Sequence, residues 1–218
     1  MLILACISAH GFGHGSRTAA VLTALHRRKP HWRLVVSSAL SADFLAMAMG
    51  AVPFEQRHCH WDVGVVQADA LGADPGATLA ALEALELRLP PQLEAEAAWL
   101  QQQNEPVLVL GDVPPAAALL AERLGAPLVW LANFGWDAIY APMGPAFAPW
   151  AASATARYRQ GTALIAFKDQ KAQPFDIGTE VRPGLYLVRL GLRSAELGPD
   201  PKGVATTTLT LSVPELPN

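Results

Sequence analysis

The chain has 218 residues and a mass of 23.2 kDa, and 51% of its residues are apolar while 16% are charged. This length suits one domain with a short appendage, because single cores usually stop growing at roughly 250–300 residues. The 17 Gly and 18 Pro stay well below the share typical of low-complexity chains, which excludes disorder as the main state. A net charge of −3 offers no basic field for a nucleic acid, so we expect no nucleic-acid partner.

The amino-terminal segment 1–7 is apolar, but no Lys or Arg precedes it, and residues 8–14 are unlike a signal-peptide cleavage site. No window approaches 18 uninterrupted apolar residues, so we expect no membrane span. Cys6 and Cys59 lie outside any Cys-x-x-Cys pattern, which favours reduced thiols and a cytoplasmic protein.

Short apolar runs alternate with longer helical stretches, which is typical of a parallel sheet buried on both faces. The expected strands are 2–8, 33–37, 51–56, 106–111, 127–132 and 163–167. The expected helices lie near 16–28, 41–49, 76–103, 115–124 and 137–159, the third broken at Pro90-Pro91 because proline lacks a backbone donor. Ser41 can cap its helix, and Gly50 and Gly125 can end theirs. The pattern predicts an α/β, doubly wound, Rossmann-like domain over residues 1–182.

The carboxy-terminal segment 183–218 differs in composition from the rest. Residues 185–190 can form one more strand, whereas 194–203 has the composition of a linker. The stretch 204–213 is rich in Thr and β-prone. We expect a short tail, frayed or forming an edge strand.

Three glycines, Gly11, Gly13 and Gly15, follow the first strand and open directly into a helix. Glycine allows the backbone to approach a ligand closely, and a helix start offers free N–H groups to an anion or a polar oxygen. The dinucleotide fingerprint needs Gly where Ser16 stands, and no acidic residue closes the second strand. A nicotinamide cofactor is therefore disfavoured.

Asp112 follows the fourth strand. In the common strand order 3-2-1-4-5 the first and fourth strands are neighbours, about 4.8 Å apart, which would place Asp112 beside His10 and His14. A histidine held by a buried carboxylate can take a proton from a hydroxyl group. The alternative is that Asp112 only caps the following helix.

Asn133, Trp136 and Asp137 follow the fifth strand. Polar groups flanked by aromatic rings suit a sugar, which has hydroxyls at its edge and C–H groups on its face. The alternative is a capped helix start with Trp136 and Tyr140 in the core.

The segment 58–62 contains His58, Cys59 and His60, whose two histidines would point the same way in an extended chain. A structural zinc needs four ligands, so we expect no metal site. The sequence also lacks a phosphate-binding P-loop and a G-x-S-x-G hydrolase motif.

Four motifs occur in order along the chain, at residues 10–17, 66–70, 111–114 and 133–140. Together they resemble the amino-terminal half of a GT-B glycosyltransferase, with most similarity to the glycosyltransferase-like region of plant L-arabinokinases and its free-standing bacterial relatives. The resemblance covers residues 1–182. It implies that His14 is the general base on an acceptor hydroxyl, with His10 as the competing choice, and that Asp112 orients the base.

The same motifs supply the residues that we expect to contact substrate: His10, Gly11, Phe12, Gly13, Gly15, Arg17, Gln67, Asp69, Asn133, Trp136 and Asp137. The resemblance implies inverting transfer from a nucleotide sugar, which is a substrate rather than a cofactor, without a metal. The expected partner is a small-molecule sugar acceptor.

In the GT-B pattern a carboxy-terminal Rossmann half holds the nucleotide sugar and would begin near residue 200. This chain instead runs through Thr206, Thr207 and Thr208 to Asn218. We therefore interpret 183–218 as the stump of a linker, and expect a donor-binding domain supplied in trans or a homodimer. The alternatives are a non-catalytic sugar- or nucleotide-binding module and a phosphate-binding enzyme that uses the glycine turn.

Overall fold

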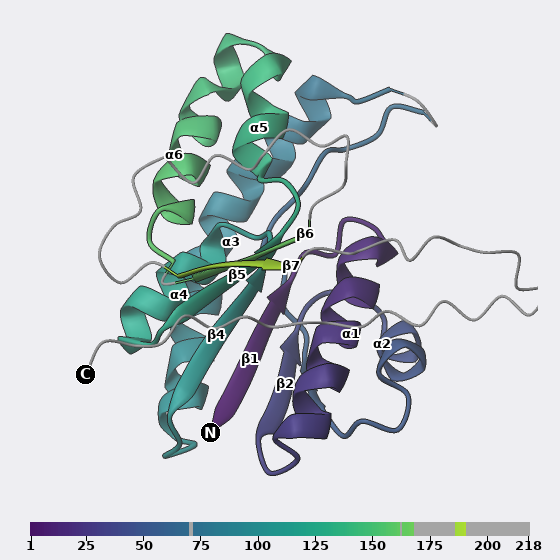
Figure 1. The fold of residues 1–218 in the computed structure, drawn as a ribbon. Coiled ribbons are helices and arrows are strands. Elements are labelled where there is room, and N and C mark those ends of the chain that lie inside the picture. The colour runs from purple at the N-terminus through teal and green to yellow at the C-terminus, as the bar shows by residue number, and fades with distance from the viewer. Residues whose placement is uncertain (70–71, 162, 168–185, 191–218) are drawn as a thin grey trace, which may run out of the picture.

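The computed structural model describes residues 1–69, 72–161, 163–167 and 186–190 (Figure 1). Seven strands form one sheet in the order β3-β2-β1-β4-β5-β6-β7, and every neighbouring pair is parallel. The strands are β1 (Leu2–Ile7), β2 (Arg33–Ser37), β3 (Glu55–Arg57), β4 (Val107–Asp112), β5 (Leu128–Ala132), β6 (Ala163–Phe167) and β7 (Tyr186–Leu190). The predicted order of the first five strands is confirmed.

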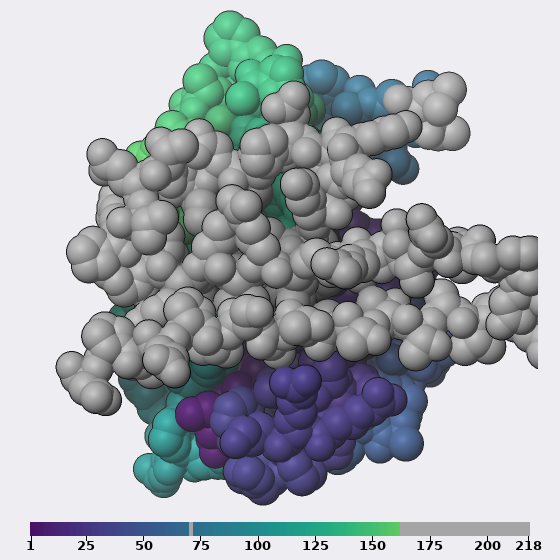
Figure 2. All heavy atoms as spheres, in the orientation of Figure 1, coloured from purple at the N-terminus to yellow at the C-terminus, as the bar shows by residue number. Residues whose placement is uncertain are grey.

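Helices cover both faces of this sheet. They are α1 (Phe12–Arg28), α2 (Ala42–Met49), α3 (Pro75–Gln101), α4 (Ala116–Leu124), α5 (Trp136–Tyr140) and α6 (Ala148–Tyr158). Two short 3₁₀ turns, η1 (Ala141–Met143) and η2 (Pro145–Phe147), connect α5 to α6. In the space-filling view α1, in purple, and the α5–α6 region, in green, lie at opposite ends of the molecule (Figure 2).

The central strand β1 is buried along its whole length. Its alternate side chains point to opposite faces: Leu4 belongs to the core under α3, α4 and α6, whereas Ile3 belongs to the core under α1 and α2. A strand that is buried on both faces needs apolar residues at every position, and residues 2–7 have this pattern. The α/β, doubly wound fold class is confirmed.

The predicted break of α3 at Pro90 and Pro91 is wrong, because the helix runs through both prolines. Each interior proline costs about 3 kcal/mol or more. Leu82 before the prolines and Leu93 and Leu100 after them are buried in the same core, at about 1.5–3 kcal/mol for each fully buried side chain. Packing on both sides of the prolines therefore offsets the local cost.

The predicted single helix over 137–159 is also wrong. Pro142 and Pro145 lie in the two 3₁₀ turns, and Gly144 between them has a φ of +114°. These residues interrupt the regular hydrogen bonding and divide the segment into α5 and α6. The predicted caps are confirmed: the Ser41 hydroxyl accepts a hydrogen bond from the Phe44 N–H, and Gly125 ends α4 in the left-handed conformation.

The strand predicted over 185–190 is confirmed by β7, which pairs with β6 and extends the sheet beyond residue 182. The predicted linker 194–203 and Thr-rich stretch 204–213 lie outside the described residues. Within the described ranges, no helix has the length and apolarity needed to cross a membrane.

The thiols of Cys6 and Cys59 are free and buried. Burial raises the pKa of the Cys59 thiol to about 12, so at neutral pH it is protonated and a poor nucleophile.

Arg57, at the end of β3, donates two hydrogen bonds from its guanidinium to the buried Glu96 of α3. The guanidinium also lies 4.0 Å from the centre of the Trp99 ring. These contacts attach the end of β3 to α3.

A substitution at Gly111 in β4 tests how tightly β4 packs against Trp130 and Ala117. A Cβ there would lie 2.5 Å from the Trp130 ring and 3.2 Å from the Ala117 methyl. We expect Gly111→Ala to lower the free energy of unfolding by about 1–3 kcal/mol in urea denaturation, because the core is already filled. Gly76→Ala is the control, since its nearest contact would be 3.5 Å from Asp74; equal effects of the two changes would contradict this account.

Candidate functional site

The candidate site lies where β1, β4 and β5 end. Ile7 pairs with Asp112 in the register of β1 and β4, so the segment that leaves β1 starts beside this carboxylate. Asp112 is fully buried. The sequence prediction that Asp112 neighbours the glycine turn is confirmed, and a buried negative charge in this position requires partners.

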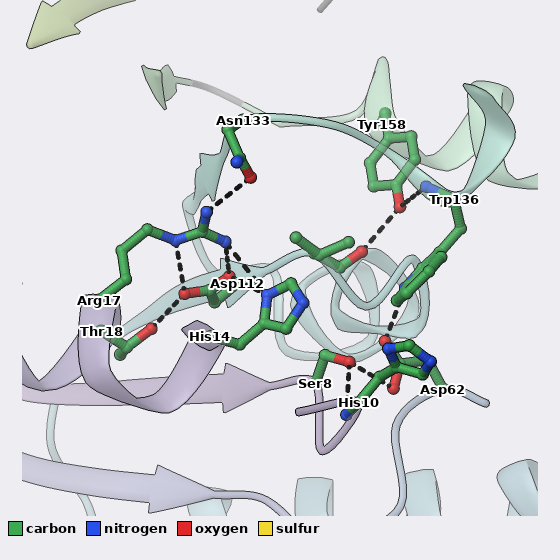
Figure 3. A network of polar contacts seen from close by, with 11 residues as sticks. Ser8, His10, His14, Arg17, Thr18, Asp62, Asp112, Asn133, Trp136 and Tyr158 are labelled. Carbon is green, nitrogen blue, oxygen red and sulfur yellow. Dashed lines mark hydrogen bonds and ion pairs between the residues drawn. The ribbon is translucent and has the colours of Figure 1, made fainter. Parts of the chain in front are cut away.

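Three side chains of α1 converge on the Asp112 carboxylate (Figure 3). His14 Nδ1 lies 3.0 Å from Oδ1, and the Thr18 hydroxyl donates to Oδ2 at 2.5 Å. Arg17 donates from Nε to Oδ2 at 3.2 Å and from Nη2 to Oδ1. Burying a charge costs several kcal/mol unless it is paired and hydrogen-bonded, and here one cation and further donors satisfy both oxygens.

The His14 side chain is 9% exposed, and its Nδ1 lies near two different partners. Its Nδ1 lies 3.0 Å from Asp112 and 3.1 Å from Arg17 Nη2. A guanidinium only donates, so Nδ1 either donates to Asp112 or accepts from Arg17, but not both. Donation to the carboxylate leaves the other ring nitrogen, Nε2, with its lone pair.

Arg17 also connects the ends of two strands. Its Nη1 donates to Asn133 Oδ1 at 2.7 Å, and Asn133 directly follows β5. The guanidinium therefore bridges β4 and β5. The structure brings together four of the residues singled out in the sequence: His14, Arg17, Asp112 and Asn133.

His10 lies in a second network with different partners. Its Nε2 is 3.0 Å from the Val65 carbonyl, which can only accept, so this nitrogen carries the proton. The ring meets Trp136 edge-on at 5.3 Å. A Cβ at Gly64 would lie 2.2 Å from the His10 ring, which shows how tightly the imidazole is packed.

Asp62 joins this second network and was not expected as a site residue. Its Oδ1 accepts from the Ser8 hydroxyl at 3.0 Å, and its Oδ2 accepts from Trp136 Nε1 at 2.7 Å. Burial raises the pKa of the Asp62 carboxyl, which the two hydrogen bonds partly oppose. Trp136 also contacts His14, with ring centres 6.3 Å apart, so one indole touches both histidines.

The glycine turn is tighter than predicted, because α1 begins at Phe12 rather than near residue 16. Gly11 precedes the helix with a φ of +83°, a conformation that L side chains rarely adopt. Gly13 has open space around it. At Gly15 a Cβ would lie 2.4 Å from the Phe44 ring, so this glycine permits the packing of α1 on α2.

The remaining predicted residues have local partners. Phe12 is 63% exposed, with its ring 4.6 Å from that of Phe44. Gln67 forms an isolated bridge with Ala73, and Asp69 accepts from the Gly72 N–H at 2.7 Å. Asp137 accepts from the Thr155 hydroxyl of α6 at 3.0 Å. For these residues a substrate contact stays a prediction.

Val113, directly after Asp112, holds a strained backbone. Its φ is +81°, and for a buried, β-branched residue this conformation costs on the order of 1–3 kcal/mol. The Tyr158 hydroxyl donates to the Val113 carbonyl at 2.7 Å and accepts from the Trp136 N–H at 3.1 Å. One buried phenol thus fixes the backbone beside Asp112 and the start of α5.

Three site residues escaped sequence reasoning: Thr18, Asp62 and Tyr158. Thr18 stands four residues after His14, which places both on one helix face, so helical spacing could have found it. Asp62 lies in an irregular segment without periodicity, and Tyr158 approaches from a distant helix. No sequence signal points to either one.

The His58 and His60 rings lie 5.2 Å apart, so the expectation that they point the same way is confirmed. Among the described residues no group of three or more His, Cys, Asp or Glu side chains could hold a metal ion.

No family model matches the chain. Over 140 residues it is 34% identical to L-arabinokinase of Arabidopsis thaliana, a match that spans 62% of this chain and 13% of that protein. Its structure is similar to UGT2 of Phytolacca americana in complex with UDP-2fluoro-glucose and pterostilbene, with a TM-score of 0.57, 14% identity, and coverage of 89% of this chain and 55% of that one. It is also similar to UGT89C1 of Arabidopsis thaliana in complex with UDP-L-rhamnose, with a TM-score of 0.55, 10% identity, and coverage of 87% and 51%.

The chain therefore has a Rossmann-like α/β fold of the GT-B glycosyltransferase type, and the resemblance drawn from its motifs is confirmed. In sequence it is similar to part of L-arabinokinase of Arabidopsis thaliana. The chain spans about half the length of the similar structures and about an eighth of that relative.

The Asp112 cluster makes a direct prediction about stability. Asp112→Ala leaves the largely buried guanidinium of Arg17 without its charge partner, so we expect the free energy of unfolding to fall by about 3–5 kcal/mol. Glu55→Ala removes the exposed ion pair with Arg33 and is expected to cost at most about 1 kcal/mol. Chemical denaturation measures both, and a loss at Asp112 no larger than that at Glu55 would contradict this description of the cluster.

Proposed function

We propose that this chain is the acceptor-binding half of an inverting, nucleotide-sugar-dependent sugar transferase. The observation that carries the proposal is the contact of His14 Nδ1 with the buried Asp112 carboxylate, 3.0 Å apart. A carboxylate at Nδ1 fixes the tautomer and stabilises the imidazolium that forms when Nε2 takes a proton. His14 is the proposed base on an acceptor hydroxyl, and Asp112 is its orienting partner.

The geometry favours His14 over His10 as this base. His10 Nε2 donates to the Val65 carbonyl and the ring packs against Gly64 and Trp136. Each imidazole keeps a lone pair on its other nitrogen, Nδ1 of His10 and Nε2 of His14. The neutral Val65 carbonyl stabilises an imidazolium less than the Asp112 carboxylate does, so His14 is the better base.

Arg17 binds the carboxylate and is itself held by Asn133. The exposed first turn of α1 offers backbone N–H groups. Gly11 and Gly13 leave that turn open, and the helix start attracts a negatively charged or polar oxygen. We place the donor phosphate or the acceptor there. The aromatic rings of Phe134 and Trp136, with centres 5.7 and 6.3 Å from that of His14, form the apolar wall beside the base.

The proposed reaction uses a small-molecule sugar acceptor and a nucleotide sugar as donor, with neither a metal nor another cofactor. Since the chain spans about half the length of the similar structures, a donor-binding half completes the enzyme in this proposal, either from another chain or through homodimerisation. Two of the similar structures are complexes with UDP-sugars, so such donors are the first to test.

The tautomer of His14 can be measured on the isolated chain. In a long-range ¹H–¹⁵N spectrum at neutral pH, we expect Nδ1 to carry the proton and Nε2 to be bare. His10, with Nε2 donating to Val65, is the internal comparison and should show the opposite tautomer. Protonation of His14 at Nε2, with Nδ1 accepting from Arg17, would remove the basis for its role as the base.

Transfer by the chain together with its donor-binding half tests the roles directly. We expect His14→Ala to lower kcat by about 10²–10⁴-fold, the usual contribution of a positioned base. His10→Ala is the matched control and should retain most of kcat, with circular dichroism confirming that both variants fold. A loss confined to His10→Ala would reverse the assignment, and absence of nucleotide-sugar binding with any donor-binding half would favour a non-catalytic binding module.

A further inference from the structure

Asp62 is a second carboxylate near the proposed base, and its hydrogen-bond partners are neutral. Its side chain is half-buried and accepts from the Ser8 hydroxyl at 3.0 Å and from Trp136 Nε1 at 2.7 Å. Among the residues that the structure describes, no ion pair involves Asp62, whereas Asp112 is bound by the guanidinium of Arg17. A carboxylate removed from water in this way favours a cation nearby.

The indole of Trp136 connects this carboxylate to both histidines. Its ring centre lies 5.3 Å from that of His10 and 6.3 Å from that of His14. In the view of Figure 3 the His14 ring lies between the Asp112 and Asp62 clusters. Burial raises the pKa of the Asp62 carboxyl; its two hydrogen bonds oppose this shift, and so do the charges of His14 and, less strongly, His10. Because an electrostatic interaction is mutual, the carboxylate in turn favours the imidazolium of His14.

Further charged or titratable groups face His14 or Asp62 from the elements packed around them. They are Arg17 of α1, Glu86 of α3, Asp112 of β4, Tyr140 of α5, and Arg157 and Tyr158 of α6. Burial, with a smaller contribution from the charge of Asp62, raises the pKa of both tyrosines, which are therefore neutral at neutral pH. Only an imidazole ordinarily changes its charge near neutral pH, so the formation of an imidazolium is the event to which Asp62 responds.

We propose that Asp62 is a positioning residue for the base: it holds Trp136 beside His14, and its negative charge stabilises the imidazolium that forms during transfer. The inference rests on the proposed role of His14 and deepens it. In the step, the acceptor O–H bond breaks as the oxygen bonds to the donor sugar, and the proton moves to His14 Nε2. The bond from sugar to phosphate breaks, and its electron pair leaves with the nucleotide. Asp62 takes no proton and touches no substrate.

A titration of the histidine rings in the isolated chain, followed by ¹H–¹⁵N NMR, tests the electrostatic part. Asp62→Asn removes the charge but keeps an oxygen for Trp136 Nε1 and a polar group for Ser8. We expect the His14 ring to titrate about one pH unit lower in this variant, because its imidazolium loses an opposite charge. The ring of His31, which is exposed at the other end of the sheet, should titrate at an unchanged pH.

Ser8→Ala separates the charge from the hydrogen bonding, because it removes one donor and keeps the carboxylate. His14 should then titrate at the same pH or higher. Glu83→Gln removes an exposed carboxylate of α3 and should leave the titration unchanged. Circular dichroism shows whether each variant folds. An unchanged His14 titration in folded Asp62→Asn would overturn the proposal, and a fall in Ser8→Ala would do so even if Asp62→Asn did not fold.

Transfer by the chain together with its donor-binding half gives the kinetic readout. We expect Asp62→Asn to lower kcat by about tenfold, which corresponds to one pH unit of lost imidazolium stabilisation, with the acceptor KM unchanged. The acid limb of the pH profile of kcat/KM should move to lower pH, because the base stays neutral further down. A purely structural role would not move that limb.

The two proposals fail in different ways. If His14→Ala leaves transfer intact, the proposed function is wrong whatever Asp62 does. If His14→Ala abolishes transfer while Asp62→Asn keeps the acid limb in place, only the inference about Asp62 is wrong.

Discussion

A single buried carboxylate sets the arrangement around the ends of the central strands. Asp112 stands at the end of β4 with no exposure to solvent, and a charge in that position requires partners. Arg17, His14 and Thr18 supply them from one face of α1. If α1 rotated or slid along β4, the buried Asp112 carboxylate would lose these partners. The need to pair this charge therefore also fixes the orientation of the His14 imidazole.

Two further contacts extend this constraint beyond α1. Arg17 reaches Asn133 after β5, and the Tyr158 hydroxyl holds the strained carbonyl of Val113 next to Asp112. A valine with a left-handed backbone persists only where its surroundings over-determine it. The strand end is therefore held in place from three elements, α1, β5 and α6. Such preorganisation suits the proposed general base, since its geometry has to exist before substrate arrives.

Much of the fold could be predicted because parallel strands leave a strong signal. Residues 2–7 form a continuous apolar run since both faces of β1 are covered, and the run places Asp112 and the glycine turn at the same edge of the sheet. The break predicted in α3 failed because burial of Leu93 and Leu100 depends on the tertiary structure, whereas the proline pair is a local signal.

The limits of prediction at the site have the same cause. His14 and Asp112 could be anticipated from motif and strand order. Asp62 could not, because it lies in an irregular segment, and its role comes from a contact with Trp136 that is 74 residues away in sequence.

Trp136 has a consequence for communication within the molecule. Its indole packs near His14, donates to Asp62 and forms part of the wall of a pocket between α3, α5 and α6. Any ligand that binds one arrangement of this ring better than another shifts its population. Linkage then requires reciprocity: if occupancy of the pocket alters affinity beside His14 by some factor, occupancy beside His14 alters affinity in the pocket by the same factor. A side chain shared by the pocket and the surroundings of His14 couples the two thermodynamically wherever the ring has more than one position.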